Sequence, residues 1–369
     1  KTETGAAGPP DVLKEIEAII RPLEDGTGTV RRMPLDEAKA RGRVEVFDPA
    51  PDYLARVGEL FDLEAFRGAG YTVVCEPLFG SASGYFTKLL GGGRTRVVEL
   101  HTERNPFFGG LDPEPIPPNI NEFLARIPAE RADVGLAVDG DADRAGLGDE
   151  HGKFVTTLTT YALLMWYLLE IRKLRAPVVK TVNMTLMADR LAERYGVAVH
   201  EVPVGFKFVG PKMAETGAMM GGEESGGFGF SMHLPERDGI VADLFVLDFM
   251  LKTRKSPSRL IAELMDLAGP SSYRRRDIHF EAATYADQKR RIMETLSGAE
   301  PRELAGVPVK RRVLLETNDG VKFFRDDSSW LLVRLSGTEP LVRVYAETRS
   351  EGDLQPLIDE GARMVGAPH

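Results

Sequence analysis

The sequence lacks several features that would assign it to a specialised class of protein. It contains one cysteine, Cys75, so neither an intramolecular disulfide nor a thiolate metal cluster can form. It has no excess of basic residues: the formal net charge is -9, which argues against a nucleic-acid-binding protein. The longest apolar run, Tyr161–Ile171, is interrupted by Glu170 and is too short to span a membrane. We therefore expect a cytoplasmic protein that binds neither nucleic acid nor membrane.

What remains is the composition of an ordinary globular protein, with 43% hydrophobic and 28% charged residues. A chain of 369 residues is longer than one hydrophobic core usually serves, so we expect two to four domains. The sequence begins at Lys1, and no signal peptide follows it. This start predicts that a preceding segment is missing from the sequence.

Short β-branched runs alternate with amphipathic segments in the first two thirds of the chain. The apolar spacing predicts a first helix that opens at Pro9-Pro10-Asp11 and ends near Gly26. Two sets of strands are predicted: Val44–Phe47, Tyr71–Cys75, Thr95–Leu100 and Val134–Val138, then Val178–Val182 and Val197–Val202. Helices are predicted in the second set at Thr157–Lys173 and Thr185–Tyr195. This alternation indicates an α/β fold class with consecutive α/β domains.

The pattern changes after Gly269-Pro270, which is typical of a helix end. Beyond it the predicted elements are a helix at Tyr285–Leu296, strands at Val307–Glu316, Trp330–Leu335 and Val342–Glu347, and a helix that opens at Ser350. Strands that follow one another with few helices between them indicate an α+β arrangement. The sequence therefore predicts a C-terminal α+β domain with a mainly antiparallel sheet.

Three carboxylates follow the predicted strand Val134–Val138 at every second position. Asp139, Asp141 and Asp143 are separated only by glycine and alanine, and Arg144 comes next. Close carboxylates repel one another unless a positive charge neutralises them, and oxygen ligands suit a hard cation such as Mg²⁺. The strand and the spacing therefore predict a metal site rather than an acidic surface turn.

Two other chemistries share part of this pattern. The three aspartates and Glu150 fit ligand positions of a calcium loop, but Arg144 stands where that loop turns on a glycine, and a strand precedes it instead of a helix. A phosphatase with a nucleophilic aspartate at the strand end is the other alternative, although the acids and the arginine exceed what that reaction needs.

A glycine-rich segment, Gly221–Gly227, contains Glu223, Glu224 and Ser225. Carboxylates and hydroxyls bind the hydroxyl groups of sugars, and small neighbours let a ring approach closely. Taken alone, a glycine-rich hinge with solvated acids is an open alternative. The charged turn Glu236–Gly239 precedes an apolar segment and is predicted mainly as the start of a helix.

A third polar loop lies between two predicted strands near the C-terminus. It gathers two guanidinium groups, two hydroxyls and a glycine: Arg334, Ser336, Gly337, Thr338 and Arg343. Cations with hydroxyl and amide donors bind phosphate dianions, and an ordinary hairpin would not need both arginines. The sequence predicts a phosphate-binding loop here.

The three loops, in this order, resemble those of the α-D-phosphohexomutase family, which includes phosphoglucomutase and phosphomannomutase. The matching segments are Asp139–Arg144, Gly222–Ser225 and Arg334–Thr338, and Val204–Lys207 is similar to the family's glycine-aromatic-lysine turn. Members of that family have four domains, the first of which carries a reactive phosphoserine. The resemblance implies a remnant of that first domain with a linker, followed by metal-binding, sugar-binding and phosphate-binding domains, at residues 1–42, 43–152, 153–270 and 271–369.

The family's phosphoserine motif, threonine-x-serine-histidine-asparagine-proline, does not occur in these 369 residues. Arg104-Asn-Pro106 follows no serine-histidine pair, and Ser81 and Ser83 are predicted to lie on a structural turn. We therefore expect the chain as given to be inactive without an N-terminal segment. Gly227 also departs from the histidine of some members, whereas the paired glutamates are similar to the phosphoglucomutase branch.

The resemblance implies interconversion of hexose 1-phosphate and hexose 6-phosphate, with glucose favoured, through a phosphoserine and a 1,6-bisphosphate intermediate. It implies Mg²⁺ on the three aspartates, Arg144 and Lys207 at the transferring phosphoryl group, and Glu223 and Ser225 on the sugar. The phosphate that does not react would be held by Arg334, Ser336, Gly337, Thr338 and Arg343. Glucose 1,6-bisphosphate is the implied activator, and the implied partners are hexose phosphates, bound by a monomer or homodimer.

Three alternatives stay open at the level of sequence. The first two are phosphomannomutase and phosphoglucosamine mutase, because one or two hydroxyl contacts that the loop residues do not determine decide which sugar is accepted. The third is a non-catalytic protein that binds sugar phosphates and Mg²⁺, which the missing serine motif would favour.

Overall fold

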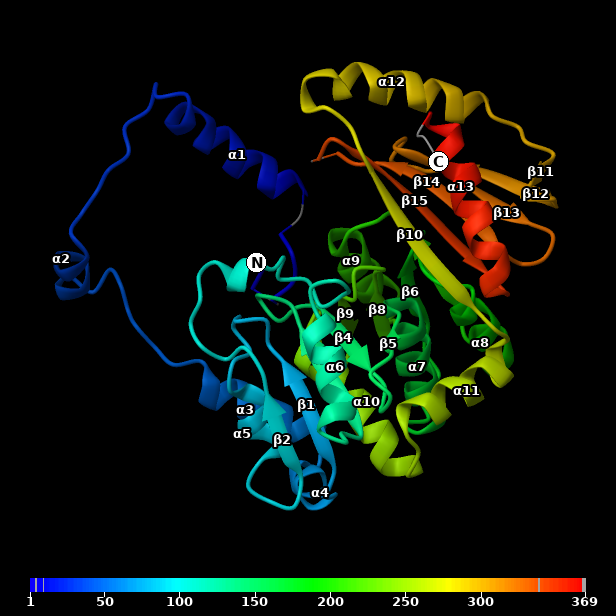
Figure 1. Cartoon of the computed structure of the whole chain (residues 1–369). Helices are drawn as coiled ribbons and strands as arrows, with labels where there is room; N and C mark the ends of the chain where they lie inside the picture. The colour runs from blue at the N-terminus through cyan, green and yellow to red at the C-terminus, as the bar shows by residue number, and fades with distance from the viewer. Residues whose placement is uncertain (4, 9, 338, 367–369) are drawn as a thin grey trace.

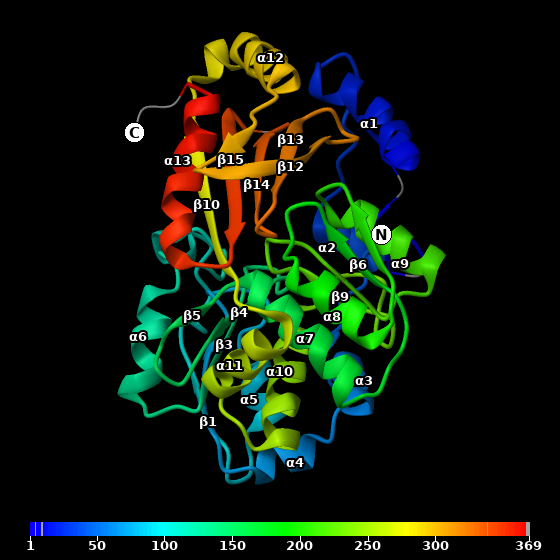
Figure 2. The same ribbon diagram turned by 90° about the vertical axis from the view of Figure 1, so that its right-hand side faces the viewer.

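Three sheets follow one another along the chain in the computed structural model, which describes residues 1–3, 5–8, 10–337 and 339–366 (Figure 1). The first two sheets are mixed and covered by helices, and the third is antiparallel. Figure 2 shows the third sheet stacked above the other two. The predicted fold class, consecutive α/β units followed by an α+β unit, is confirmed. No helix in the described part of the chain is both long and apolar enough to cross a membrane.

The first sheet has the strand order β2-β1-β3-β4-β5, in which β2, β1 and β3 are parallel. Its elements are α3 (Ala50–Leu60), α4 (Leu63–Gly68), β1 (Thr72–Glu76), α5 (Tyr85–Leu90), β2 (Arg96–Glu99), η1 (Phe108–Gly110), α6 (Asn121–Ala129), β3 (Val134–Val138), β4 (Ala145–Gly148) and β5 (Phe154–Val155). Alternate residues of β3 join two different apolar clusters, so the strand is buried on both faces. Its carboxyl end leads directly into the acidic loop, at the edge of the sheet where ligands usually bind.

The second sheet has the order β7-β6-β8-β9. Its elements are α7 (Thr157–Glu170), β6 (Val178–Thr181), α8 (Met187–Tyr195), β7 (Val199–Val202), α9 (Phe206–Thr216), β8 (Met220–Gly222), β9 (Phe228–Phe230), α10 (Gly239–Thr253) and α11 (Pro257–Ala268). Helices α7 and α10 are apolar on nearly every side, and they pack against each other and against β4. They join the first and second sheets into one hydrophobic core.

The third sheet has the order β10-β15-β14-β13-β12-β11. Its elements are β10 (Ser272–His279), α12 (Ala282–Gly298), β11 (Glu303–Leu304), β12 (Val307–Leu314), β13 (Gly320–Arg325), β14 (Trp330–Leu335), β15 (Leu341–Thr348), η2 (Glu351–Asp353) and α13 (Leu354–Met364). One face, with Trp330 and Tyr345, belongs to the main core. The other, with Leu331 and Val333, shares a second core with α12 and α13, so the middle strands are buried on both sides.

Two buried charged side chains attach the third sheet to the second unit. Glu347 accepts hydrogen bonds from the Thr185 hydroxyl at 2.6 Å and the Leu186 amide at 2.9 Å. Lys322 donates to the Val182 carbonyl and lies 3.3 Å from Glu201, and burial lowers the pKa of Lys322 to about 8. Because both side chains hold the segment that follows β6, they determine where the third sheet lies over the rest of the protein.

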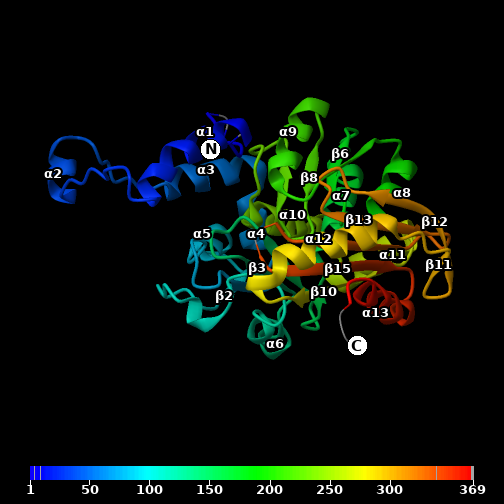
Figure 3. The ribbon, with the colours of Figure 1, turned by 90° about the horizontal axis from the view of Figure 1, so that it is seen from above.

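The N-terminal segment contains one confirmed and one wrong prediction. The first helix is α1 (Pro10–Glu24), and Pro9 lies outside the described residues. The strand predicted at Val44–Phe47 is absent, because these residues form an extended segment with exposed side chains and no partner strand. The segment contains only the short helix α2 (Leu35–Ala40), which extends away from the sheets (Figure 3). Strands β10 and β13 were not predicted, since charged residues interrupt their apolar pattern.

One buried acid in α10 has no partner. Asp243 is fully buried, and neither of its carboxylate oxygens has a hydrogen-bond partner among the described residues. Burial raises the pKa of Asp243 well above its ordinary value. Asp248 on the same helix differs, because it accepts a hydrogen bond from Tyr167 at 2.5 Å.

Replacing Asp243 by asparagine should stabilise the protein at pH 8 more than at pH 5. The unfolded carboxyl ionises above about pH 4 while the folded one keeps its proton, so wild-type stability falls as pH rises through this interval. We expect a gain on the order of 1 kcal/mol at pH 8 in urea unfolding. The matched variant Asp248→Asn should keep the wild-type pH dependence, and an unchanged pH profile in Asp243→Asn would contradict the prediction.

Candidate functional site

The acidic loop is a tight turn between β3 and its antiparallel neighbour β4. Asp139 accepts a hydrogen bond from the Arg144 amide at 3.0 Å, and the Asp139 amide donates to the Arg144 carbonyl at 3.3 Å. This closure places carboxylate oxygens of Asp139, Asp141 and Asp143 within 4.8 Å of one another. The local fold therefore concentrates three acids at one point, as the spacing predicted.

Burial and mutual repulsion change the acidity of this cluster. Burial raises the pKa of Asp139 to about 7, opposed by the Arg144 amide and reinforced by the neighbouring Asp143 and Asp141 carboxylates. Burial also raises the pKa of Asp143, although the guanidinium of Arg237 opposes this shift. The cluster thus favours the binding of positive charge, either protons or a cation.

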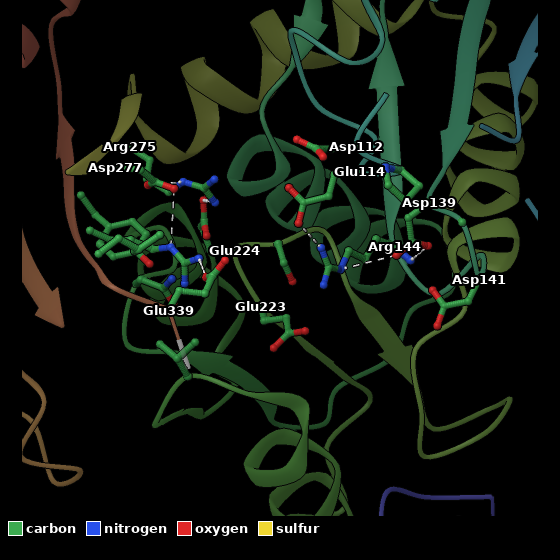
Figure 4. Close-up of a pocket in the computed structure, with 18 of the residues that line it drawn as sticks. Asp112, Glu114, Asp139, Asp141, Arg144, Glu223, Glu224, Arg275, Asp277 and Glu339 are labelled. Atoms are coloured by element: carbon green, nitrogen blue, oxygen red, sulfur yellow. Dashed lines mark hydrogen bonds and ion pairs between the residues drawn. The ribbon is translucent and has the colours of Figure 1, made fainter. Parts of the chain in front are cut away.

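Arg144 lies beside the cluster and is held by a residue that sequence reasoning missed. Its Nη1 atom donates to Glu114 at 2.7 Å, and its Nε atom lies 3.5 Å from Asp139. Glu114 belongs to a segment that crosses over the acidic loop, where the Gly140 amide donates to the Pro113 carbonyl at 3.2 Å. The guanidinium is therefore fixed from both sides and faces the cavity (Figure 4).

The glycine-rich segment forms the turn between β8 and β9. Glu223 is buried, and its amide donates to the Gly227 carbonyl at 3.1 Å. The Ala145 amide in turn donates to the Gly226 carbonyl at 2.9 Å, so this turn is bonded directly to the strand that follows the acidic loop. The two loops that were predicted separately form one backbone unit.

Arg237 joins the same two loops through its side chain and was also missed. Its guanidinium lies 2.5 Å from Asp143 and donates to Glu223 at 3.0 Å. The turn Glu236–Gly239 does start a helix, because Asp238 caps α10 by accepting from the Val241 amide. Its arginine, however, bridges the acidic loop and the glycine-rich loop.

The predicted phosphate loop lies at the end of β14, and Thr338 is outside the described residues. Arg334 and Arg343 are directly opposite each other on β14 and β15. Arg334 is bound to Asp319 at 2.8 Å, and Arg343 to Glu339 at 2.7 Å. From α12, Tyr285 and Lys289 donate to the Ser336 carbonyl at 3.0 and 2.9 Å, so the helix supports the loop from behind.

One cavity of about 980 Å³ lies between the three sheets (Figure 4). The predicted site residues that line it are Asp139, Asp141, Arg144, Glu223, Ser225 and Arg343. Asp143 borders a smaller cavity of about 270 Å³ beside the acidic loop. Lys207, on the first turn of α9, and the loop residues Arg334, Ser336 and Gly337 lie outside both linings. Unpredicted lining residues include Glu114, Arg275, Asp277 and His279.

Similar proteins were then sought by sequence and by structure. Residues 51–152, 159–268 and 287–363 match the phosphoglucomutase/phosphomannomutase models for alpha/beta/alpha domain II, alpha/beta/alpha domain III and the C-terminal domain. A phosphoglucomutase/phosphomannomutase of Thermococcus kodakarensis is 30% identical over 355 residues, which cover 95% of this chain and 72% of that protein. The chain belongs to the α-D-phosphohexomutase family.

Other relatives agree with this family. A protein of Methanothermobacter thermautotrophicus named as a probable phosphoglucosamine mutase is 30% identical over 347 residues, 94% of this chain and 70% of that one. A crystal structure from Thermus thermophilus, described as a phosphomannomutase, superimposes with a TM-score of 0.79 at 30% identity. The match covers all of this chain and 74% of that one. The resemblance found in the three loops therefore extends along the chain.

The acid cluster fits the divalent cation of a phosphohexomutase. Its donors are all carboxylate oxygens, which hard cations such as Mg²⁺ prefer, and they converge without any intervening side chain. Arg144 and Arg237 lie beside the aspartates and offset part of their charge. The three aspartates are thus the residues that would hold the metal.

Metal binding should weaken as the pH falls through about 7. A proton on Asp139 competes with the cation, so the affinity for Mn²⁺ should drop about tenfold per pH unit below the pKa of Asp139 and level off above it. Calorimetric titration between pH 5.5 and 8 measures this. Asp141→Asn should lower the affinity at least about tenfold at pH 8, whereas Asp112→Asn, on the cavity wall outside the cluster, should bind as wild type does. A flat pH profile would contradict the assignment.

Proposed function

We propose that this chain binds a hexose phosphate in the central cavity and supplies the metal-, sugar- and phosphate-binding parts of a mutase that interconverts hexose 1-phosphate and hexose 6-phosphate. The observation that carries this proposal is the shared cavity: Arg144 beside the acid cluster, Glu223 and Arg343 all line it, each from a different sheet unit. A sugar with phosphates at its two ends needs cations at both ends and hydroxyl acceptors between them.

Each predicted residue has a role in this proposal. Arg144 faces the transferring phosphoryl group, and Lys207 would approach it from α9, near the cavity wall at Val204. Glu223 and Ser225 bind ring hydroxyls. The phosphate that does not react is bound by Arg343 with Arg334, Ser336, Gly337 and Thr338. A divalent cation such as Mg²⁺ on the three aspartates would offset charge on the transferring group.

The reaction moves one phosphoryl group twice. A phosphoserine gives its phosphoryl group to the free hydroxyl of the sugar monophosphate, which forms the 1,6-bisphosphate and leaves the serine hydroxyl with the proton. After the sugar turns round, the other phosphate passes back to the serine and the isomeric monophosphate remains. Released bisphosphate would rephosphorylate the serine, which is why glucose 1,6-bisphosphate should activate. The protein mainly positions the groups and stabilises their charge.

The serine motif of the family is absent from these 369 residues, so this chain should bind substrate without turnover. The test is to supply α-glucose 1-phosphate, Mg²⁺ and a trace of glucose 1,6-bisphosphate, and to follow glucose 6-phosphate with a coupled dehydrogenase. We expect no product, but calorimetric binding of glucose 6-phosphate. Turnover would contradict the missing-serine proposal, and absence of binding would contradict the function itself.

The contacts of the two glutamates support a neutral sugar such as glucose. Glu223 is already paired with Arg237 at 3.0 Å, and Glu224 accepts from Tyr273 at 2.6 Å and lies 3.7 Å from Arg275. A 2-amino sugar carries an ammonium group that would favour a carboxylate without such partners. The second candidate, phosphoglucosamine mutase, is supported by the name of the Methanothermobacter relative.

Glucose 6-phosphate should therefore bind at least about threefold more tightly than glucosamine 6-phosphate at pH 7, since the amino group gains no unpaired carboxylate. Calorimetry with both ligands under the same conditions measures the ratio. Mannose 6-phosphate serves as the comparison for the 2-hydroxyl configuration. Tighter binding of glucosamine 6-phosphate would favour the second candidate.

A further inference from the structure

Strand β10 contains three consecutive arginines that the strand sorts between two environments. Side chains alternate along a strand, so Arg274 and Arg276 lie on one face and Arg275 on the other. Arg274 donates to Glu351 at 3.0 Å and Arg276 to Asp359 at 3.3 Å, both toward η2 and α13. Arg275 instead lines the central cavity.

Arg275 lies between the sugar-binding loop and the phosphate-binding strand. Its Nη1 atom is 3.7 Å from Glu224, and its Nε atom is 3.0 Å from Asp277. Asp277 in turn lies 3.7 Å from Nε of Arg343 on the adjacent strand. Figure 4 shows Arg275, Asp277 and Glu339 on the side of the cavity opposite Arg144 and Asp139.

The charges on this side of the cavity make Arg275 necessary for binding an anion. Arg343 faces two carboxylates, Asp277 and Glu339, so alone it would leave the surface negative. Arg334 adds no net charge, because Asp319 binds it at 2.8 Å. A phosphate dianion would be repelled from such a surface, and a second guanidinium is needed to balance it.

We infer that Arg275 is a further substrate-binding residue, whose guanidinium contacts the phosphate monoester held next to Arg343. The inference rests on the proposed function and assigns to that site a cation that none of the three sequence motifs contains. The side chain is partly exposed to the cavity, and the nitrogens beyond its Nε atom make no hydrogen bond shorter than 3.5 Å to another described residue. A guanidinium with free donors in a fixed position is suited to bidentate binding of phosphate.

The test compares four variants of the 369-residue chain in calorimetric titrations with glucose 6-phosphate and with inorganic phosphate. Arg275→Met should weaken both ligands about tenfold or more, which is the loss of one charge-assisted hydrogen bond. Arg275→Lys should recover part of the affinity, since it keeps the charge but loses the fork. Arg276→Met, on the same strand and the opposite face, should stay within about twofold of wild type.

Tyr273→Phe is the fourth variant, because Tyr273 holds Glu224 without adding charge. It should reduce the affinity for glucose 6-phosphate but leave inorganic phosphate unchanged. The inference is overturned if Arg275→Met binds inorganic phosphate as wild type does, or if Arg276→Met or Tyr273→Phe reproduces its loss. If wild type itself binds no glucose 6-phosphate, the proposed function fails and this inference with it; a wild type that binds while Arg275→Met is unchanged overturns the inference alone.

Discussion

The repulsion among three aspartates at the end of β3 is the constraint on which the rest of the site depends. A fully buried strand delivers Asp139 to this point, and the turn brings Asp141 and Asp143 within 4.8 Å of it. Carboxylates so close together need positive charge nearby, or they take up protons. The surrounding structure supplies that charge through Arg144 and Arg237, before any cation is considered.

These two arginines also assemble the cavity. Each guanidinium has more donors than the acidic loop uses, so the remaining nitrogens bind carboxylates from other segments: Arg144 binds Glu114, and Arg237 binds Glu223. The neutralisation of the metal loop and the placement of the sugar loop are therefore one interaction network. The antiparallel sheet completes the cavity because Glu347 and Lys322 attach it to the second unit through their own buried contacts.

Much of this arrangement could be predicted from the sequence, and what could not has a common cause. The acid cluster depends on neighbours in the chain, so the strand and the spacing of two residues were enough to predict it. Glu114, Arg237 and Arg275 act through partners that are distant in sequence, and in the linear pattern each resembles an ordinary surface charge. The wrong strand at Val44–Phe47 shows the same limit, because β-branched residues form a strand only where a partner strand exists.

The glycine at position 227 illustrates how such a distant contact changes the interpretation of a motif. From the sequence alone, its departure from the histidine of some family members suggests a lost sugar contact. In the structure, a Cβ atom at Gly227 would overlap the side chain of Arg237, which needs this space to reach both Asp143 and Glu223. The glycine is thus required by the bridge between the two loops. Selection of the sugar then depends on Glu223 and Glu224, whose orientation Arg237 and Tyr273 hold.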